Sequence, residues 1–283
     1  MVKIVGVLGA GQMGNGIAHV FAQHEYQVRL YDVIPAQIEK ALKTIGKNLG
    51  RQAEKGIFPV ESVPGILERI KVVKELSEFS DCDLVIEAAN ENEALKYDLF
   101  RQLDSVVKKD AILATNTSSI SITGIAAVTK RPEKVIGMHF MNPVPVMQLV
   151  EVIRGLATSD ETFQVISGLV EKLGKAMAVS QDYPGFIVNR ILMPMINEAI
   201  FVLYEGIATA EDIDKGMKLG TNHPMGPLAL ADLIGLDTVL AIISVLYEGF
   251  KDPKFRPCPL LVKMVNAGYL GKKSGRGFFT YQS

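Results

Sequence analysis

The sequence contains no tryptophan, two cysteines and four histidines among its 283 residues. Cys82 and Cys258 are too few and too far apart for a disulfide framework or a cysteine-ligated metal site, so we expect reduced thiols and no metal. Acidic and basic residues nearly balance, at a formal net charge of -1, and there is no long basic run. This balance argues against nucleic acid as the main partner.

The sequence also shows no pattern typical of a targeting signal or a membrane span. The first residues show no basic region followed by an apolar stretch and a cleavage site, so we expect a cytoplasmic protein without a secretory signal or transit peptide. The most apolar stretch, residues 186–203, is interrupted by Arg190, Asn197 and Glu198. We therefore expect no membrane span and no membrane partner.

What the sequence does contain begins with a glycine-rich loop. Residues 3–8 form a short apolar run, the loop Gly9-Ala10-Gly11-Gln12-Met13-Gly14 follows at once, and a helical pattern continues through 15–23. A second apolar run then ends at Asp32. Strand, glycine loop, helix, strand and acidic residue in this order indicate a dinucleotide site.

Each part of that unit has a physical role in the prediction. The glycines allow a tight turn and let the backbone approach the pyrophosphate at the helix N-terminus. Asp32 is placed to accept hydrogen bonds from the adenosine ribose and to repel a 2'-phosphate, so NAD is favoured and NADP is the less favoured alternative. The expected cofactor-binding residues here are Gly9, Gly11, Gln12, Met13, Gly14 and Asp32.

Strand-like and helix-like segments alternate over the first 180 or so residues. The expected strands are short runs rich in valine and isoleucine, typical of strands buried on both faces. They lie at 3–8, 27–32, 70–73, 83–88, 111–115, 134–139, 147–153 and 176–180. With helices at 34–55 and 92–107 between them, the pattern predicts an α/β fold with a doubly wound, Rossmann-type, mostly parallel sheet.

The character of the chain changes after Asp182. No strand pattern follows, and residues 186–203 are apolar on most helical faces, which indicates a helix buried on most sides. We therefore predict a Rossmann domain over 1–182 and an all-α domain over 183–283. Further helices are expected at about 209–219, 227–234, 237–249 and 258–267. Because the second domain is small and apolar, we expect a homodimer formed through it.

Three cations share one face of the helix expected over 34–55. Lys47, Arg51 and Lys55 are spaced four residues apart, which aligns them along a helix. Such a row is typical of a solvated face, and it is also the arrangement that binds a phosphate-bearing substrate. The spacing alone leaves both readings open.

His139 is the histidine best placed for chemistry. It ends an apolar strand, and in this fold ligands bind at the carboxyl ends of parallel strands. Histidine suits general acid–base catalysis near neutral pH. Glu151 lies within the next apolar run, where a carboxylate is costly unless it is paired. If the two strands are neighbours, Glu151 can orient the His139 ring; an exposed sheet edge is the other possibility for Glu151.

Several segments together resemble the 3-hydroxyacyl-CoA dehydrogenase family. The resemblance runs from the glycine loop to the C-terminal region, so it covers essentially the whole chain, and the combination is highly specific. The matching segments are His139-Phe140-Met141-Asn142-Pro143 with Glu151, Asn116-Thr117-Ser118-Ser119, Asp182-Tyr183-Pro184-Gly185-Phe186-Ile187-Val188-Asn189-Arg190, and Gly275-Arg276-Gly277-Phe278-Phe279.

The resemblance implies a role for each matching residue. His139 is the general base and Glu151 orients it, while Ser118 and Asn189 bind the reacting oxygen of the substrate in a cleft between the two domains. Near the cofactor the resemblance places Glu91, Lys96, Asn116 and Lys273, with a solvated turn as the alternative for Lys273. It assigns Arg51 and Lys55 to the phosphates of coenzyme A.

The implied reaction is a reversible hydride transfer between NAD(H) and C3 of a short-chain 3-hydroxyacyl-CoA, in fatty acid or butanoate metabolism, without a metal. Two alternatives remain at this point. A related NAD-dependent hydroxyacid or sugar-acid dehydrogenase would share the two-domain plan but would not need Arg51 and Lys55. A non-catalytic NAD- or CoA-binding protein would share the fold, since fold alone does not establish activity.

Overall fold

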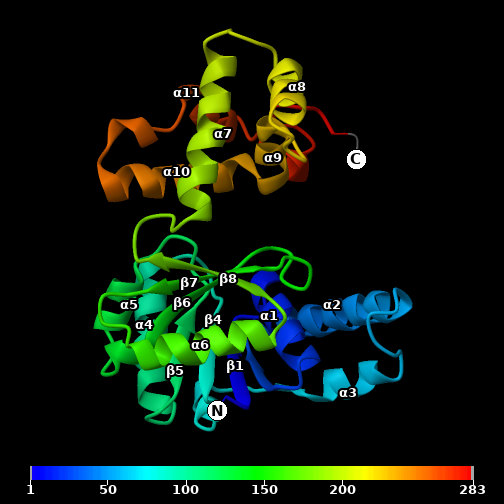
Figure 1. Ribbon diagram of the computed structural model, residues 1–283, viewed down its shortest axis with the longest axis vertical. Helices are drawn as coiled ribbons and strands as arrows, with labels where there is room; N and C mark the ends of the chain where they lie inside the picture. The colour runs from blue at the N-terminus through cyan, green and yellow to red at the C-terminus, as the bar shows by residue number, and fades with distance from the viewer. Residues whose placement is uncertain (1, 282–283) are drawn as a thin grey trace. The chain divides into compact units, whose positions relative to one another are not determined.

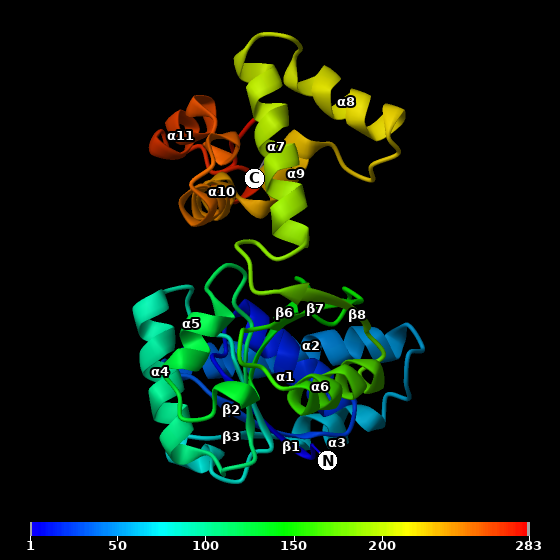
Figure 2. The same ribbon diagram turned by 60° about the vertical axis from the view of Figure 1, so that its left-hand side comes forward.

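The computed structural model describes residues 2–281. The chain divides into two compact units, with the boundary between Tyr183 and Pro184. This boundary lies one residue after the one predicted from the sequence. Figures 1 and 2 show an α/β unit and an all-helical unit, as the sequence predicts.

The first unit is built on an eight-stranded sheet with the order β3-β2-β1-β4-β5-β6-β7-β8. Neighbouring strands are parallel except β6 and β7, which are antiparallel. The strands are β1 (Ile4–Leu8), β2 (Gln27–Tyr31), β3 (Ile70–Val72), β4 (Leu84–Glu87), β5 (Ile112–Thr115), β6 (Val135–Phe140), β7 (Leu149–Arg154) and β8 (Ala176–Gln181). The predicted doubly wound, mostly parallel sheet is therefore confirmed.

Helices cover both faces of this sheet (Figure 1). The longer ones are α1 (Gln12–Gln23), α2 (Pro35–Glu54), α4 (Glu93–Val106) and α6 (Asp160–Lys172), and the shorter ones α3 (Ser62–Glu68) and α5 (Ile122–Ala127). One core combines buried residues of α1, α2, α3 and α6 with alternate residues of the strands, such as Val5, Leu30 and Met138. The helices α4 and α5 contact β5 and β6.

Alternation along the strands places several polar side chains on one face of the sheet. Successive strand residues point to opposite faces. Ile86, Ala114, Met138 and the pair Val150 and Val152 pack in the core with α1 and α2. Their neighbours therefore face the other way. These neighbours are Glu87, Thr115, His139 and Glu151, and all four are buried.

The second unit consists of helices packed around their own apolar core. Its helices are α7 (Val188–Tyr204), α8 (Ala210–Gly220), α9 (Pro227–Ile234), α10 (Leu236–Phe250) and α11 (Pro259–Asn266). Over residues 2–281, no single helix is both long and apolar enough to cross a membrane. The pair α9 and α10 meets those criteria only when joined, and the chain bends by 100° between them.

Candidate active site

The glycine loop after β1 has the geometry of a phosphate-binding turn. A Cβ at Gly9, whose φ is +102°, would lie 2.5 Å from the Ala88 carbonyl oxygen, and one at Gly14 would lie 1.8 Å from the Gly9 carbonyl oxygen. Both positions therefore need glycine for the turn itself. A Cβ at Gly11 would meet no heavy atom within 4 Å, so the loop backbone is open there. Gln12 and Met13 follow in the first turn of α1.

A cavity of about 250 Å³ lies beside this loop, between the ends of β1, β2 and β4. Gly11 and Asp32 line it, together with apolar side chains such as Val33 and Leu99. The Asp32 carboxylate accepts hydrogen bonds from the Ala10 and Ile34 amides at 2.7 and 2.8 Å. These features fit the adenosine half of a dinucleotide: the glycine backbone is open, the cavity is partly apolar, and an acidic group lies at its rim.

His139 and Glu151 lie directly opposite each other on the antiparallel strands β6 and β7. The distance from His139 Nδ1 to Glu151 Oε2 is 2.7 Å, with the glutamate fully buried and the histidine 9% exposed. A carboxylate on Nδ1 favours the tautomer with a proton on Nδ1 and stabilises the imidazolium when it forms. The structure thus brings together the acid–base pair that the sequence predicts.

The segment after β5 is joined to the end of β6 by Asn116. Its side-chain oxygen accepts a hydrogen bond from the Phe140 amide at 2.9 Å, one residue after His139. Asn116 therefore fixes the spacing between the strand end that precedes Ser118 and the strand end that carries His139. Its predicted contact with the cofactor stays a prediction.

Glu91 organises the turn that contains Ser118. One oxygen, Oε1, accepts hydrogen bonds from Thr117 Oγ1, the Ser118 amide, Ser118 Oγ and Ser119 Oγ at 2.6 to 3.2 Å. Burial acts to raise the pKa of the Glu91 carboxyl, but Lys96 and these hydrogen bonds outweigh it and hold that pKa below its usual value. Glu91 is therefore an anion that holds the predicted substrate-binding serine in place.

Behind Glu91 lies a buried ion pair of which the sequence analysis identified only one partner. Lys96 Nζ is 2.6 Å from Glu87 Oε1 and 3.4 Å from Glu91 Oε2, and both Lys96 and Glu87 are at most 1% exposed. Lys96 was predicted from family resemblance, whereas Glu87 was missed. A carboxylate that ends an otherwise apolar strand was the available signal, the same signal that identified Glu151.

The three cations on α2 share an exposed face, as the spacing predicts. Ile38, Ala41, Ile45 and Leu49 make up the buried stripe of the helix. The basic residues Lys47, Arg51 and Lys55 are exposed. Among residues 2–281, none of the three forms an ion pair with a carboxylate, so their charge is available to an anionic ligand.

The second unit carries the remaining predicted residues. Asn189 lies in the first turn of α7 and is 8% exposed. The next residue, Arg190, has its guanidinium carbon 4.3 and 4.2 Å from the ring centres of Phe250 and Phe255, which fixes this end of α7. Lys273 pairs with Asp237 at 2.6 Å. The predicted roles of Asn189 and Lys273 are not tested by these contacts.

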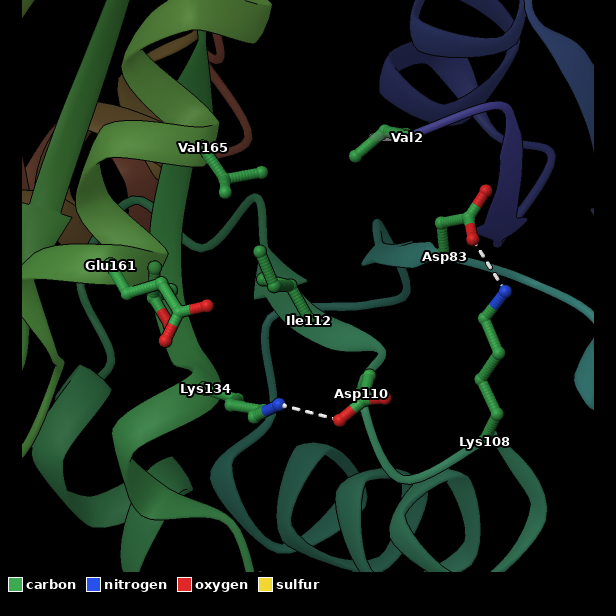
Figure 3. A pocket seen from close by; sticks show the side chains of 9 residues that line it. Val2, Asp83, Lys108, Asp110, Ile112, Lys134, Glu161 and Val165 are labelled. Carbon is green, nitrogen blue, oxygen red and sulfur yellow. Dashed lines mark hydrogen bonds and ion pairs between the residues drawn. The ribbon is translucent and has the colours of Figure 1, made fainter.

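A second cavity, of about 470 Å³, lies at the opposite edge of the sheet, where β4 and β5 begin (Figure 3). Four of its charged side chains are paired with each other: Lys108 with Asp83, and Lys134 with Asp110 at 3.3 Å. Because ligands of this fold bind at the carboxyl ends of the strands, we do not assign the active site to this cavity.

In comparisons with known proteins, both units match models of the same family. Residues 4–183 match the family model described as the NAD-binding domain of 3-hydroxyacyl-CoA dehydrogenase, and residues 185–281 match the model of its C-terminal domain.

Individual relatives match over nearly their whole length. A 3-hydroxybutyryl-CoA dehydrogenase of Bradyrhizobium diazoefficiens is 57% identical over 282 residues, which cover 100% of this chain and 96% of the relative. A probable 3-hydroxybutyryl-CoA dehydrogenase of Bacillus subtilis is also 57% identical, with 99% and 98% covered. The crystal structure of (S)-3-hydroxybutyryl-CoA dehydrogenase from Ralstonia eutropha superposes with a TM-score of 0.97 at 51% identity and covers both chains fully.

Proposed function

Because this chain belongs to the 3-hydroxyacyl-CoA dehydrogenase family, we propose that it transfers hydride reversibly between NAD(H) and C3 of a short-chain 3-hydroxyacyl-CoA. The proposed substrate pair is 3-hydroxybutyryl-CoA and acetoacetyl-CoA. The observation that carries this proposal is the buried pair of His139 and Glu151, 2.7 Å apart at the carboxyl edge of the sheet.

The residues of this chain have complementary tasks in that reaction. When bound, NADH supplies the hydride, and the developing alkoxide at C3 needs a proton. Protonated His139 donates that proton, and in the reverse direction neutral His139 removes the proton from the hydroxyl group. Glu151 keeps the ring oriented and stabilises its charged form. Ser118 is proposed to bind the substrate oxygen and so to hold C3 in position, and Asn189 is a further proposed substrate-binding residue.

The cofactor is proposed to occupy the glycine loop and the cavity beside Asp32. Gly11 leaves room for the pyrophosphate at the N-terminus of α1, and the Asp32 carboxylate accepts hydrogen bonds from the ribose hydroxyl groups. A 2'-phosphate would meet the Asp32 carboxylate, so NAD is preferred over NADP. The nicotinamide half is proposed to contact Glu91 and Asn116. Lys96 acts there through Glu91, with which it forms an ion pair.

Coenzyme A is proposed to bind the exposed basic face of α2. Arg51 and Lys55 point their charge into solvent without a carboxylate partner among residues 2–281, and Lys47 extends the same row. Phosphate groups are strong acceptors for such side chains. The face therefore distinguishes a CoA thioester from the corresponding free acid.

We propose a cytoplasmic homodimer that works in fatty acid or butanoate metabolism, with neither nucleic acid nor membrane as a partner. The second unit exposes large apolar side chains that a partner subunit would cover. Ile191 is 66% exposed on α7, and one turn later Met195 begins an apolar groove that also includes Val202 and Met217. The apolar row on α7 (Ile191, Met195 and Val202), with Met217 of α8 beside it, is the proposed dimer surface.

The proposed activity is tested by following NADH oxidation at 340 nm with acetoacetyl-CoA, with NADPH in a parallel cuvette. We expect turnover with NADH at a kcat/KM well above that with NADPH. Free acetoacetate with NADH, and gulonate with NAD in the direction of NADH formation, serve as controls for the hydroxyacid and sugar-acid alternative. Turnover of a free acid in preference to the thioester would reject the proposed substrate, and no NADH oxidation with any of several acyl-CoA compounds would reject catalysis.

A further inference from the structure

A group of three charged side chains lies at the end of β4, and one of them has no role in the mechanism above. Glu87 is the last residue of β4 and is fully buried. Its Oε1 accepts hydrogen bonds from Lys96 Nζ at 2.6 Å and from the Ala89 amide at 2.7 Å, and its Oε2 accepts one from Thr115 Oγ1 at 2.7 Å. Glu87 is therefore held rigidly by the backbone and by two neighbouring elements.

The charges of this group do not cancel. Glu87 and Glu91 are both within ion-pair distance of the single Lys96, at 2.6 and 3.4 Å. The group carries one net negative charge. Glu87 and Lys96 are at most 1% exposed and form the closer pair, so the remaining negative charge lies mainly on Glu91, whose side chain is 38% exposed.

Stability alone does not account for the buried pair. An ion pair removed from water loses hydration that its mutual attraction barely offsets, so well-packed apolar side chains would serve the fold equally well. A functional explanation for Glu87 is therefore worth seeking.

The position of Glu87 supplies that explanation. It is in register with Leu8 on β1, just before the glycine loop, and with Thr115 on β5, just before the Asn116–Ser119 segment. The adenosine cavity lies between the ends of β1, β2 and β4, with Asp32 on its β2 side. A dinucleotide whose adenosine ribose binds Asp32 would extend its nicotinamide half away from β2, toward the ends of β4 and β5. Glu87 also shares its face of the sheet with His139.

We propose that Glu87 is a positioning residue that sets the net charge of the Glu87–Lys96–Glu91 group and thereby the preference of the enzyme for oxidised over reduced cofactor. The nicotinamide ring is cationic in NAD and neutral in NADH. One net negative charge at this edge would favour the oxidised form, whereas without the Glu87 charge Lys96 and Glu91 would cancel and that preference would be lost. The inference rests on the proposed function, because it requires that NAD(H) binds at this edge.

The test compares two dissociation constants rather than activity. NADH binding is followed by its fluorescence and NAD binding by competition, and the measured quantity is the ratio of Kd for NAD to Kd for NADH. In Glu87→Gln the group becomes neutral but keeps its shape, and we expect the ratio to rise at least about threefold, because a unit negative charge near the cationic ring is removed.

Two further variants separate charge from structure. Lys96→Gln leaves two negative charges, so the ratio should fall by a similar factor. The double variant Glu87→Gln with Lys96→Gln again carries one negative charge, so its ratio should return to within about twofold of the wild type. Removing both partners can also relieve a structural defect, so thermal unfolding is measured on the same three variants. A charge effect moves the ratio without following the order of their melting temperatures.

Asp83→Asn is the matched control, because it breaks the ion pair with Lys108 at the opposite edge of the sheet and should leave the ratio unchanged. An unchanged ratio in Glu87→Gln, or no return in the double variant, would overturn the inference. If Glu87→Gln does not fold, an unchanged ratio in Lys96→Gln overturns it. If the wild type binds neither NAD nor NADH, the proposed function itself fails.

Discussion

At the scale of single residues, His139 carries the most specific prediction. Replacing it with glutamine keeps a polar side chain but removes the acid–base group, and such groups typically contribute about 10²- to 10⁴-fold to the rate. We expect His139→Gln to lower kcat at least about 10²-fold in steady-state assays while the Kd for NADH stays within about twofold.

His24→Gln provides the control for this change. His24 caps the end of α1, where its Nδ1 contacts the Val20 carbonyl oxygen at 2.8 Å, so we expect normal turnover in that variant. Near wild-type turnover in His139→Gln would reject the assignment of the general base.

Glu151 predicts a loss of rate without a loss of cofactor binding. Glu151→Gln keeps a similar shape but removes the carboxylate that orients the His139 ring and stabilises the imidazolium. We therefore expect a large fall in kcat for acetoacetyl-CoA reduction, while the Kd for NADH stays within about twofold. The measurements are kcat at saturating NADH and the fluorescence titration of NADH binding. A kcat equal to that of the wild type would contradict the orienting role.

The two cysteines are predicted to be chemically silent in the native protein. Burial, followed by the charge of Asp81, raises the pKa of Cys82 to about 12, and burial also raises the pKa of Cys258. At about pH 8 only a minute fraction of Cys82 is thiolate, the reactive form. A thiol reagent such as DTNB should label neither residue in the folded enzyme and both in guanidinium chloride. Fast labelling of the native protein would contradict this burial.

At the scale of elements, the basic face of α2 predicts a substrate-specific effect. Arg51→Ala with Lys55→Ala should raise the KM for acetoacetyl-CoA about tenfold, because two phosphate contacts are lost. The KM for acetoacetyl-pantetheine, which lacks the nucleotide and its phosphates, should not change. Lys43→Ala alters another exposed cation of the same helix and serves as the control. An equal rise with both substrates would show that α2 does not bind the phosphates.

The sequence predicted the strands better than the way they pair. All eight expected strands are present, with ends within about two residues. Most are buried runs rich in valine and isoleucine, as expected, but the edge strands β3 and β8 are largely exposed or half-buried. The antiparallel direction of β7 was not predicted. Its side chains are apolar on both sides of Glu151 in either direction, and the short turn after Phe140 rather than the strand pattern reverses the chain.

At the scale of the whole molecule, the proposed dimer gives a direct prediction. Light scattering at micromolar concentration should show twice the mass of the chain. Ile191→Asp places a charge in the apolar row on α7 and should yield a monomer, whereas Leu156→Asp, at a 90% exposed apolar side chain of the first unit, should not. A monomeric wild type would reject the homodimer, and a dimeric Ile191→Asp would move the interface elsewhere.

The sequence by itself determined the class of cofactor and the nature of the chemistry. The glycine spacing and Asp32 are local features, and their meaning depends on residues that are close along the chain. The small number of histidines is a property of composition, which also needs no fold to be read. Tertiary structure alone decided which distant charges meet. Glu151 reaches His139 because β6 and β7 are antiparallel in that register, and Glu91 reaches Ser118 because β4 and β5 end at the same edge. Side chains far apart in sequence acquire fixed distances only when the sheet is assembled. Those distances decide which charged groups interact, and the proposed reaction depends on these interactions.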